Sequence, residues 1–178
     1  MIERILIAGA GGQGVMLLGK VLATAAMKEG RFVTWLPAYG AEVRGGTANC
    51  MVIISDEEIG SPYVEEADSM IILNQPSLEK FLKILKKTGL LVLNSSLARS
   101  PELSSAKILS FPFTDLAIEQ GNMKIANMIA LGAYLAKNKI VSTNNLVETM
   151  KEMAGGKSEL VEINKKALFK GEQLANGK

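Results

Sequence analysis

The sequence predicts a three-layer α/β fold, with helices on both faces of a mostly parallel sheet and a helical region at the C-terminal end. In the first half of the chain, short apolar runs alternate with segments of helical period, a pattern typical of such sheets. A glycine-rich segment joins the first apolar run to the first helix. The hydrophobic fraction of 48% suits strands buried on both faces. A length of 178 residues fits one domain, so we expect residues 1–178 to form one.

Six apolar runs predict the strands, at residues 5–8, 32–36, 47–54, 70–73, 89–93 and 107–110. Pro37 is expected to end the second strand, because proline lacks the N–H that a sheet ladder uses. The acidic residues 56–58 predict a turn after the third strand. The carboxyl ends of parallel strands share one edge of a sheet, and ligands of such folds bind there.

Helical patterns cover residues 15–28, 76–87 and 124–137, and only helices are expected from Thr114 onward. Gly30 is expected to cap the first helix. The segment 124–137 is apolar on nearly every face, which indicates burial all round. Ser142 and Ser158 are expected to be the N-caps of the last two helices, with the glycine pair 155–156 between those helices.

Composition excludes several classes of site. Lys and Arg number 20 and Asp and Glu 18, so a net charge of +2 predicts no strong attraction to nucleic acid or to a membrane surface. The chain has no histidine, which excludes a Ser-His-Asp triad and histidine-ligated metals. One cysteine cannot hold an iron–sulfur cluster, a structural zinc or an internal disulfide. No apolar run approaches the roughly 18 residues of a membrane span, and no signal peptide is recognisable, so we expect a cytoplasmic protein.

The glycine-rich segment matches G-x-G-x-x-G between a strand and a helix, and it reads Gly9-Ala10-Gly11-Gly12-Gln13-Gly14. In dinucleotide-binding folds such glycines let the backbone approach a phosphate at the helix N-terminus. The acid that should end the second strand to bind ribose is missing from residues 32–36. Three interpretations stay open: a Rossmann-type NAD or FAD site, a tight turn without a ligand, and a loop that meets a partner chain or a ligand shared with one.

A second unusual segment follows Pro37 and contains Tyr39, Glu42, Arg44, Gly45 and Gly46. The glycines leave the planar guanidinium of Arg44 uncovered, which suits recognition of a carboxylate or a phosphate. Glu42 is expected to pair with Arg44 or to orient it. The alternative is a surface loop with a local Glu–Arg pair, which would contribute little to stability.

Two polar residues lie inside apolar segments, and for both we expect a structural role. Cys50 falls in the third strand, where a buried, unreactive thiol is expected. Asn127 falls in the apolar helix, so burial requires a hydrogen-bond partner, and we favour a structural hydrogen bond over a ligand contact.

Three motifs together resemble a known family: residues 9–15, residues 39–46 and residues 127–132. Over about residues 3–175 the chain is similar to the gamma subunit, or gamma domain, of 2-oxoacid:ferredoxin oxidoreductases of the pyruvate, 2-oxoglutarate and ketoisovalerate type. The resemblance implies a subunit of an enzyme that converts a 2-oxoacid and CoA into acyl-CoA and CO₂ and reduces ferredoxin. The N-terminal sequence is most similar to the 2-oxoglutarate branch, so we expect that substrate.

The resemblance also implies a division of labour. The complex uses thiamine diphosphate, Mg²⁺, [4Fe–4S] clusters and CoA, and this chain alone is expected to bind none of them and to be inactive. Its implied partners are the alpha and beta subunits, a delta subunit where one exists, and ferredoxin through the complex. We expect the glycine turn and the segment 39–46 to form one docking surface at the carboxyl edge of the sheet. An exposed docking face also predicts a homodimer of the isolated chain. The competing functions are a stand-alone Rossmann-type nucleotide-binding oxidoreductase and a pure scaffold.

Overall fold

The computed structural model describes residues 1–38 and 47–177, and within them six strands form one sheet. The strands are β1 (Ile2–Ala10), β2 (Phe32–Ala38), β3 (Thr47–Ser55), β4 (Ala67–Ile72), β5 (Leu85–Asn94) and β6 (Lys107–Phe111). Their order in the sheet is β2-β3-β1-β4-β5-β6. β1, β4, β5 and β6 are parallel neighbours, whereas β3 is antiparallel to both β1 and β2. The expected mostly parallel sheet is therefore mixed at β3, because the short connection over residues 39–46 cannot hold the crossover that parallel neighbours require.

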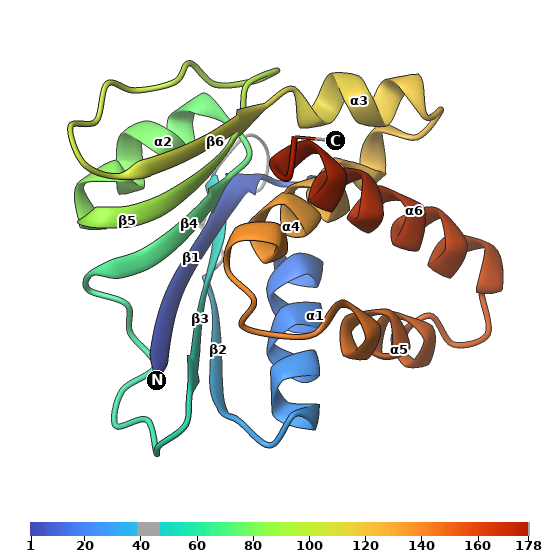
Figure 1. The fold of residues 1–178 in the computed structure, drawn as a ribbon, viewed down its shortest axis with the longest axis horizontal. Helices are drawn as coiled ribbons and strands as arrows, with labels where there is room; N and C mark the ends of the chain where they lie inside the picture. Colours follow the sequence, from blue (N-terminus) through green and yellow to red (C-terminus); the bar gives the residue numbers. More distant parts are fainter. Residues whose placement is uncertain (39–46, 178) are drawn as a thin grey trace.

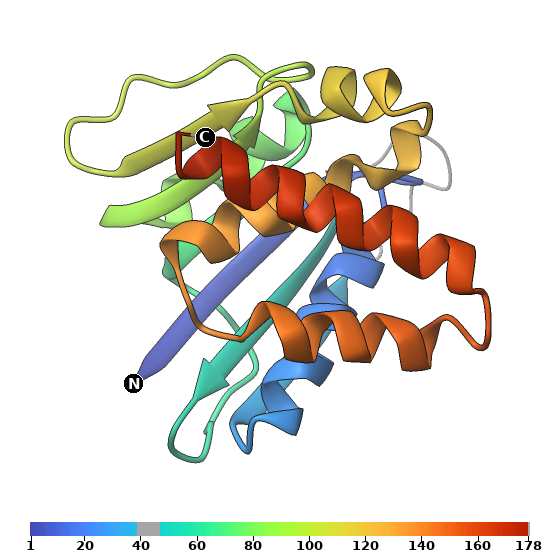
Figure 2. The ribbon, with the colours of Figure 1, turned by 45° about the vertical axis from the view of Figure 1, so that its right-hand side comes forward.

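Helices cover both faces of the sheet, as expected (Figure 1). They are α1 (Val15–Lys28), α2 (Gln75–Phe81), α3 (Phe113–Glu119), α4 (Ala126–Lys137), α5 (Thr143–Met153) and α6 (Ser158–Ala175), with 3₁₀ turns η1 (Leu82–Ile84) and η2 (Met123–Ile125). α1 and α4 lie on one face, and α5 and α6 pack outside them, whereas α2 lies on the other face (Figures 1 and 2). None of the helices in the described part of the chain is long and apolar enough to cross a membrane.

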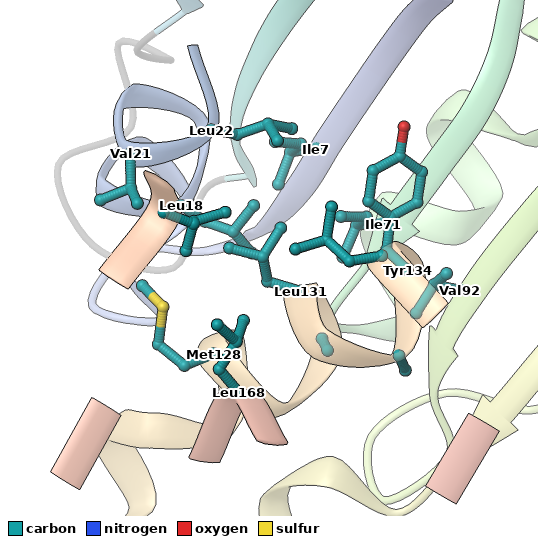
Figure 3. Packing of buried hydrophobic residues seen from close by; sticks show 14 of the residues in the cluster. Ile7, Leu18, Val21, Leu22, Ile71, Val92, Met128, Leu131, Tyr134 and Leu168 are labelled. Atoms are coloured by element: carbon teal, nitrogen blue, oxygen red, sulfur yellow. The ribbon is translucent and has the colours of Figure 1, made fainter. Parts of the chain in front are cut away.

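The pleat of the strands divides the buried side chains into two cores. Along β1, Ile5 and Ile7 face the core under α1 and α4, whereas Leu6 and Ala8 face the core under α2. All four side chains are fully buried. Figure 3 shows the larger core, where Leu131 of α4 lies close to side chains from α1 and from the strands. Burial on both faces explains why the strands read as continuous apolar runs.

The contact between α4 and α6 depends on two glycines. A Cβ added at Gly132 would overlap the backbone carbonyl of Leu168, and a Cβ added at Gly171 would overlap the carbonyl of Ile129. The two helix backbones therefore approach each other without intervening side chains at these positions. This packing explains Gly132 in the third sequence motif.

Several predicted boundaries differ from the structure, and three of them have an identifiable reason. Pro37 lies inside β2, opposite Cys50 of β3, which is tolerated because β2 is an edge strand. The helix predicted over residues 76–87 ends earlier, and residues 85–87 begin β5, where Leu85 pairs with Ala67. Ser158 is the first residue of α6 and caps nothing, since the N-cap position is Lys157. The predicted cap at Ser142 is confirmed, because its side chain accepts a hydrogen bond from the N–H of Asn145 at 3.2 Å.

Glu3 joins β1 to β4 and to the end of α4. Its Oε1 atom accepts hydrogen bonds from Ser69 Oγ at 2.6 Å, Asn138 Nδ2 at 2.6 Å and the Tyr134 hydroxyl at 3.3 Å. Burial is the largest cause that raises the pKa of Glu3 above its ordinary value, and the nearby charge of Asp68 adds to it, while the hydrogen bonds oppose the shift.

Because the pKa of Glu3 is raised in the folded protein, the folded chain keeps this proton up to a higher pH than the unfolded chain does. Between the two pKa values, unfolding therefore releases a proton and becomes easier as the pH rises. The contribution of Glu3 to stability is fully present below the pKa of the unfolded carboxyl, about 4.3, and is lost as the pH rises through the raised folded pKa. We therefore expect Glu3→Gln to gain stability relative to the unmodified chain over this pH interval. Chemical denaturation at a series of pH values measures the difference. Parallel stability curves for the two proteins would contradict this account.

Candidate functional site

The glycine turn connects β1 to α1 and is closed by the side chain of Gln13. Gly12 and Gly14 have φ angles of 88° and 73°, in the left-handed region that favours glycine. Gln13 Oε1 accepts the backbone N–H of Ala10 at 2.6 Å, and its Nε2 donates to the carbonyl of Leu73 at 3.3 Å. One carboxamide thus ties the turn to the chain that leaves β4.

The same carbonyl of Leu73 accepts a second hydrogen bond, from Asn94 Nδ2 at 3.1 Å. Asn94 is only 1% exposed. It also donates to Thr114 Oγ1 at 2.9 Å and accepts the backbone N–H of Thr114 at 3.2 Å. The ends of β1, β4 and β5 and the start of α3 are therefore joined by one buried polar network.

A pocket of about 340 Å³ opens beside this network. It lies at the carboxyl ends of β1 and β4, whose following helices α1 and α2 leave to opposite faces of the sheet. This is the topological switch point, where open α/β sheets bind their ligands. The lining residues are Ala10, Gly11, Gly12, Gln13, Leu73, Asn94, Leu97, Thr114, Met123, Lys124 and Ala126. Lys124 is the charged residue among them, and Leu97 and Met123 are 45% and 61% exposed.

Asn127 connects the glycine turn to the start of α4. It is 3% exposed, its Nδ2 donates to the carbonyl of Gly14 at 3.3 Å, and its Oδ1 accepts the N–H of Met128 at 2.8 Å. A Cβ at Gly14 would overlap Asn127 Nδ2. The expected structural hydrogen bond of Asn127 is confirmed. It joins the glycine turn to the start of α4, and residues of both segments line the pocket.

The local electrostatics favour an anionic or polar ligand at the turn. The N-cap position of α1 is Gly14, which has no side chain to cap the helix, and the first turn contains no acidic residue. The N–H groups of a first helical turn lack intrahelical partners and carry partial positive charge. Lys124 lines the pocket, and Lys80 donates to Thr47 Oγ1 at 3.1 Å at the same edge. The pocket thus combines an apolar surface with positive potential.

The structure places only part of the predicted site. Gly9, Gly11, Gly12, Gln13 and Gly14 lie together at the carboxyl edge of β1. Tyr39, Glu42, Arg44, Gly45 and Gly46 lie outside the described residues. The residues that flank them are placed: Thr47 pairs with Ala10, and Ala38 pairs with Asn49. The described residues that flank the second motif therefore lie at the same edge of the sheet as the glycine turn.

Sequence reasoning missed Asn94, Thr114 and Lys124. Asn94 ends the apolar run of the fifth strand, but only the register of β5 and β6 brings it to Thr114. Lys124 is the first residue of the helix predicted over residues 124–137, and nothing in the sequence marks it as lining a pocket. A polar residue directly after a buried strand is the signal that would have pointed to Asn94.

Cys50 is a buried thiol, as expected. It is 0% exposed, its Sγ lies 3.6 Å from the carbonyl of Val15, and burial raises its pKa to about 11. Among residues 1–38 and 47–177, no group of three or more His, Cys, Asp or Glu side chains is arranged to hold a metal ion.

Comparison with known proteins gives consistent matches. The family model for pyruvate ferredoxin/flavodoxin oxidoreductase matches residues 4–174. Ketoisovalerate oxidoreductase subunit VorA of Methanothermobacter thermautotrophicus is 37% identical over 97% of this chain, which spans only 36% of that relative's length. The keto/oxoacid ferredoxin oxidoreductase gamma subunit of Geobacter sulfurreducens is 30% identical with a TM-score of 0.84, and 99% of each chain is covered. A 2-oxoglutarate:ferredoxin oxidoreductase from Magnetococcus marinus was solved with 2-oxoglutarate, coenzyme A and succinyl-CoA bound. It is 26% identical with a TM-score of 0.90, and the matched region covers 99% of this chain and 31% of the Magnetococcus chain.

Proposed function

The chain belongs to the pyruvate ferredoxin/flavodoxin oxidoreductase family, and from this we propose that residues 1–178 act as the gamma subunit of a 2-oxoacid:ferredoxin oxidoreductase. The full-length similarity to a separate gamma subunit supports this role. The complex would convert a 2-oxoacid and CoA into acyl-CoA and CO₂ and pass the released electrons to ferredoxin. We also propose that the complex works in the cytoplasm, the compartment expected from the sequence.

The other components of the reaction would belong to partner chains. A single cysteine and no histidine cannot supply the ligands of a [4Fe–4S] cluster. Alpha and beta subunits, with a delta subunit where one exists, would therefore hold thiamine diphosphate, Mg²⁺ and the clusters. This chain would contribute a surface that closes over the shared active-site channel.

The observation that carries the proposal is the pocket at the switch point between β1 and β4. It is bounded by the glycine turn, and Thr47 and Ala38 start the segment 39–46 from the same edge. Its apolar walls and Lys124 suit a ligand with an apolar arm and anionic groups, a description that fits CoA. One related structure was solved with coenzyme A bound, which supports CoA as the ligand that meets this pocket.

The substrate is a 2-oxoacid, and among these we propose 2-oxoglutarate from the N-terminal sequence. The relatives named above differ in this respect, since one is a ketoisovalerate and another a 2-oxoglutarate enzyme. The substrate would be chosen mainly by partner chains, because the pocket of this chain faces CoA in our proposal.

The proposal is tested by purifying the tagged chain from its native host under anaerobic conditions. Co-purification of thiamine- and cluster-bearing chains, with oxoacid-dependent dye reduction, is the expected result, and the preferred oxoacid identifies the substrate. A chain that is recovered alone with a bound NAD or FAD would instead support a stand-alone Rossmann-type oxidoreductase. Recovery of partners whose activity does not respond to any change in the pocket would support a pure scaffold.

Arg44→Ala addresses the role proposed for the second motif. If Arg44 binds a CoA phosphate and is oriented by Glu42, loss of a charge-assisted hydrogen bond should raise the KM for CoA about tenfold or more. If Arg44 instead meets a carboxylate of a partner, the yield of assembled complex should fall. Steady-state kinetics and the yield of complex separate the two results. Arg44→Lys is the matched control, since it keeps the charge but not the planar fork; normal assembly and an unchanged KM in Arg44→Ala would contradict both roles.

A further inference from the structure

A second hollow, of about 620 Å³, lies at the amino-terminal edge of β4, β5 and β6, opposite to the edge that carries the glycine turn. In Figure 1 the starts of β5 and β6 lie at the left, away from that turn. Three lysines line the hollow, Lys86, Lys107 and Lys137, together with the carboxylates of Glu3 and Asp68. These charges come from five different elements of the fold, four strands and one helix, so the sheet and α4 bring them together.

Both carboxylates of the hollow already have partners within the chain. Asp68 pairs with Lys86, and with Arg4 at 3.5 Å, and it accepts the backbone N–H of Arg4 at 2.9 Å. Glu3 accepts its three hydrogen bonds from neutral donors, as described above. The Asp68 side chain is only 20% exposed. The charge of Asp68 is therefore paired within the chain and the carboxylate of Glu3 is hydrogen-bonded, so neither is in an ion pair with Lys107 or Lys137.

Lys107 and Lys137 are different, because both are exposed and neither has a carboxylate within ion-pair distance among the described residues. Exposed Lys87 follows Lys86 along the chain, and exposed Lys139 lies two residues after Lys137. A lysine at the start of edge strand β6 discourages edge pairing, and a lysine in the last turn of α4 complements the helix dipole. Each local role explains one lysine, but neither explains why both open onto one hollow.

We propose that the hollow and its lysine rim form a docking surface for a protein face that carries clustered Asp and Glu side chains. Lysines are flexible, hydrated point charges, which suit a carboxylate-rich protein surface better than recognition of one planar anion. A net charge of only +2 gives the chain no strong attraction to nucleic acid or to anionic lipid. Complementary charge of this kind directs association and sets orientation.

The remainder of the same edge supports a fixed orientation of the partner. Beyond β4, toward β3, the exposed side chains include Glu57, Glu58, Glu65 and Glu66. An acidic partner face would be attracted to the β5–β6–α4 half of the edge and repelled by the other half. The surface is distinct from the pocket proposed to meet CoA, and it rests on the proposed function only in assuming partner subunits.

The test treats the purified complex with a carbodiimide, which joins a lysine amine directly to a carboxylate in contact with it. Mass spectrometry of the crosslinked peptides should join Lys107 or Lys137 to Asp or Glu of another chain. The variant Lys107→Glu/Lys137→Glu should lose these links and retain about tenfold less partner at low salt, while raised salt should weaken the unmodified complex. Lys20→Glu/Lys166→Glu, which changes two exposed lysines of α1 and α6, is the charge-matched control and should behave like the unmodified chain.

Normal assembly of Lys107→Glu/Lys137→Glu, with no links from either lysine in the unmodified complex, would overturn the docking surface but leave the proposed function intact. Recovery of the chain without any partner would contradict the proposed function instead. In that case fluorescent poly-L-glutamate is the probe for the isolated chain. Binding that the double variant loses would support the surface, whereas equal binding by both proteins, or preference for duplex DNA or phosphatidylserine vesicles, would overturn it.

Discussion

Gly132→Ala is expected to lower the free energy of unfolding by about 3 kcal/mol, the upper part of the usual range for overpacking. The added Cβ would overlap the carbonyl oxygen of Leu168, a backbone atom that cannot rotate away, so α4 and α6 must separate. Gly171→Ala, in α6, should destabilise the fold in the same way, because its Cβ would overlap the carbonyl of Ile129 in α4. In an uncrowded helix the same change would stabilise by about 1 kcal/mol, so the sign of the effect identifies the cause.

Thermal and chemical denaturation measure this effect, and a loss of about 3 kcal/mol corresponds to a fall in Tm of roughly 6–12 °C for a chain of this size. Gly60→Ala is the control, because a Cβ at Gly60 would meet no atom within 4 Å and its φ is not in the left-handed region. Its stability should stay within about 0.5 kcal/mol of the unmodified chain. If Gly132→Ala were as stable as Gly60→Ala, the close approach of α4 and α6 would be wrong.

Gly14→Ala is expected to lower the free energy of unfolding by about 2–4 kcal/mol. A left-handed φ of 73° costs an L-residue roughly 1–2 kcal/mol, and the new Cβ would also overlap the side chain of Asn127. Because Asn127 holds the glycine turn against α4, the change should distort the pocket wall as well. We therefore also expect weaker retention of partner subunits by this variant.

Gly12→Ala separates the two contributions to this loss. Gly12 has a φ of 88°, but a Cβ there would meet no atom of residues 1–38 and 47–177 within 4 Å, so only the backbone cost of roughly 1–2 kcal/mol should appear. The double variant Gly14→Ala/Asn127→Ala should lose less stability than the sum of its single variants, since the second change removes the overlapping atoms. Strict additivity, or equal losses in Gly12→Ala and Gly14→Ala, would show that Asn127 does not crowd the turn.

Much of the fold could be predicted, because burial on both faces makes the strands readable as apolar runs. The helix predicted over residues 15–28 matches α1 at both ends, since the glycine turn and Gly30 mark its limits. The direction of β3 could not be read from its composition, because a buried strand looks the same whichever way it runs. The early end of α2 was missed for a related reason: residues 85–87 fit a helical period, but pairing with β4 draws Leu85 into the sheet.

The candidate site could be predicted only as far as its residues are close in sequence. Gln13 and Gly14 belong to one motif, and Asn127 was visible as a polar residue in an apolar helix. The role of Asn94 depends on the carbonyl of Leu73, which Gln13 also uses. No local pattern encodes this shared acceptor, because it arises from the register of β1, β4 and β5.

The strands β2 and β3 hold the described residues on either side of the segment 39–46, for which we propose a role in recognition. Both strands are held by their ladders, and β3 is further held by β1, so the connection over residues 39–46 starts and ends at fixed points. Substitutions, insertions or exchange of this segment between relatives can therefore alter what the carboxyl edge meets without disturbing the register of the sheet. If the segment 39–46 meets partners or ligands as we propose, changes within it could alter these preferences while the packing of the core stays the same.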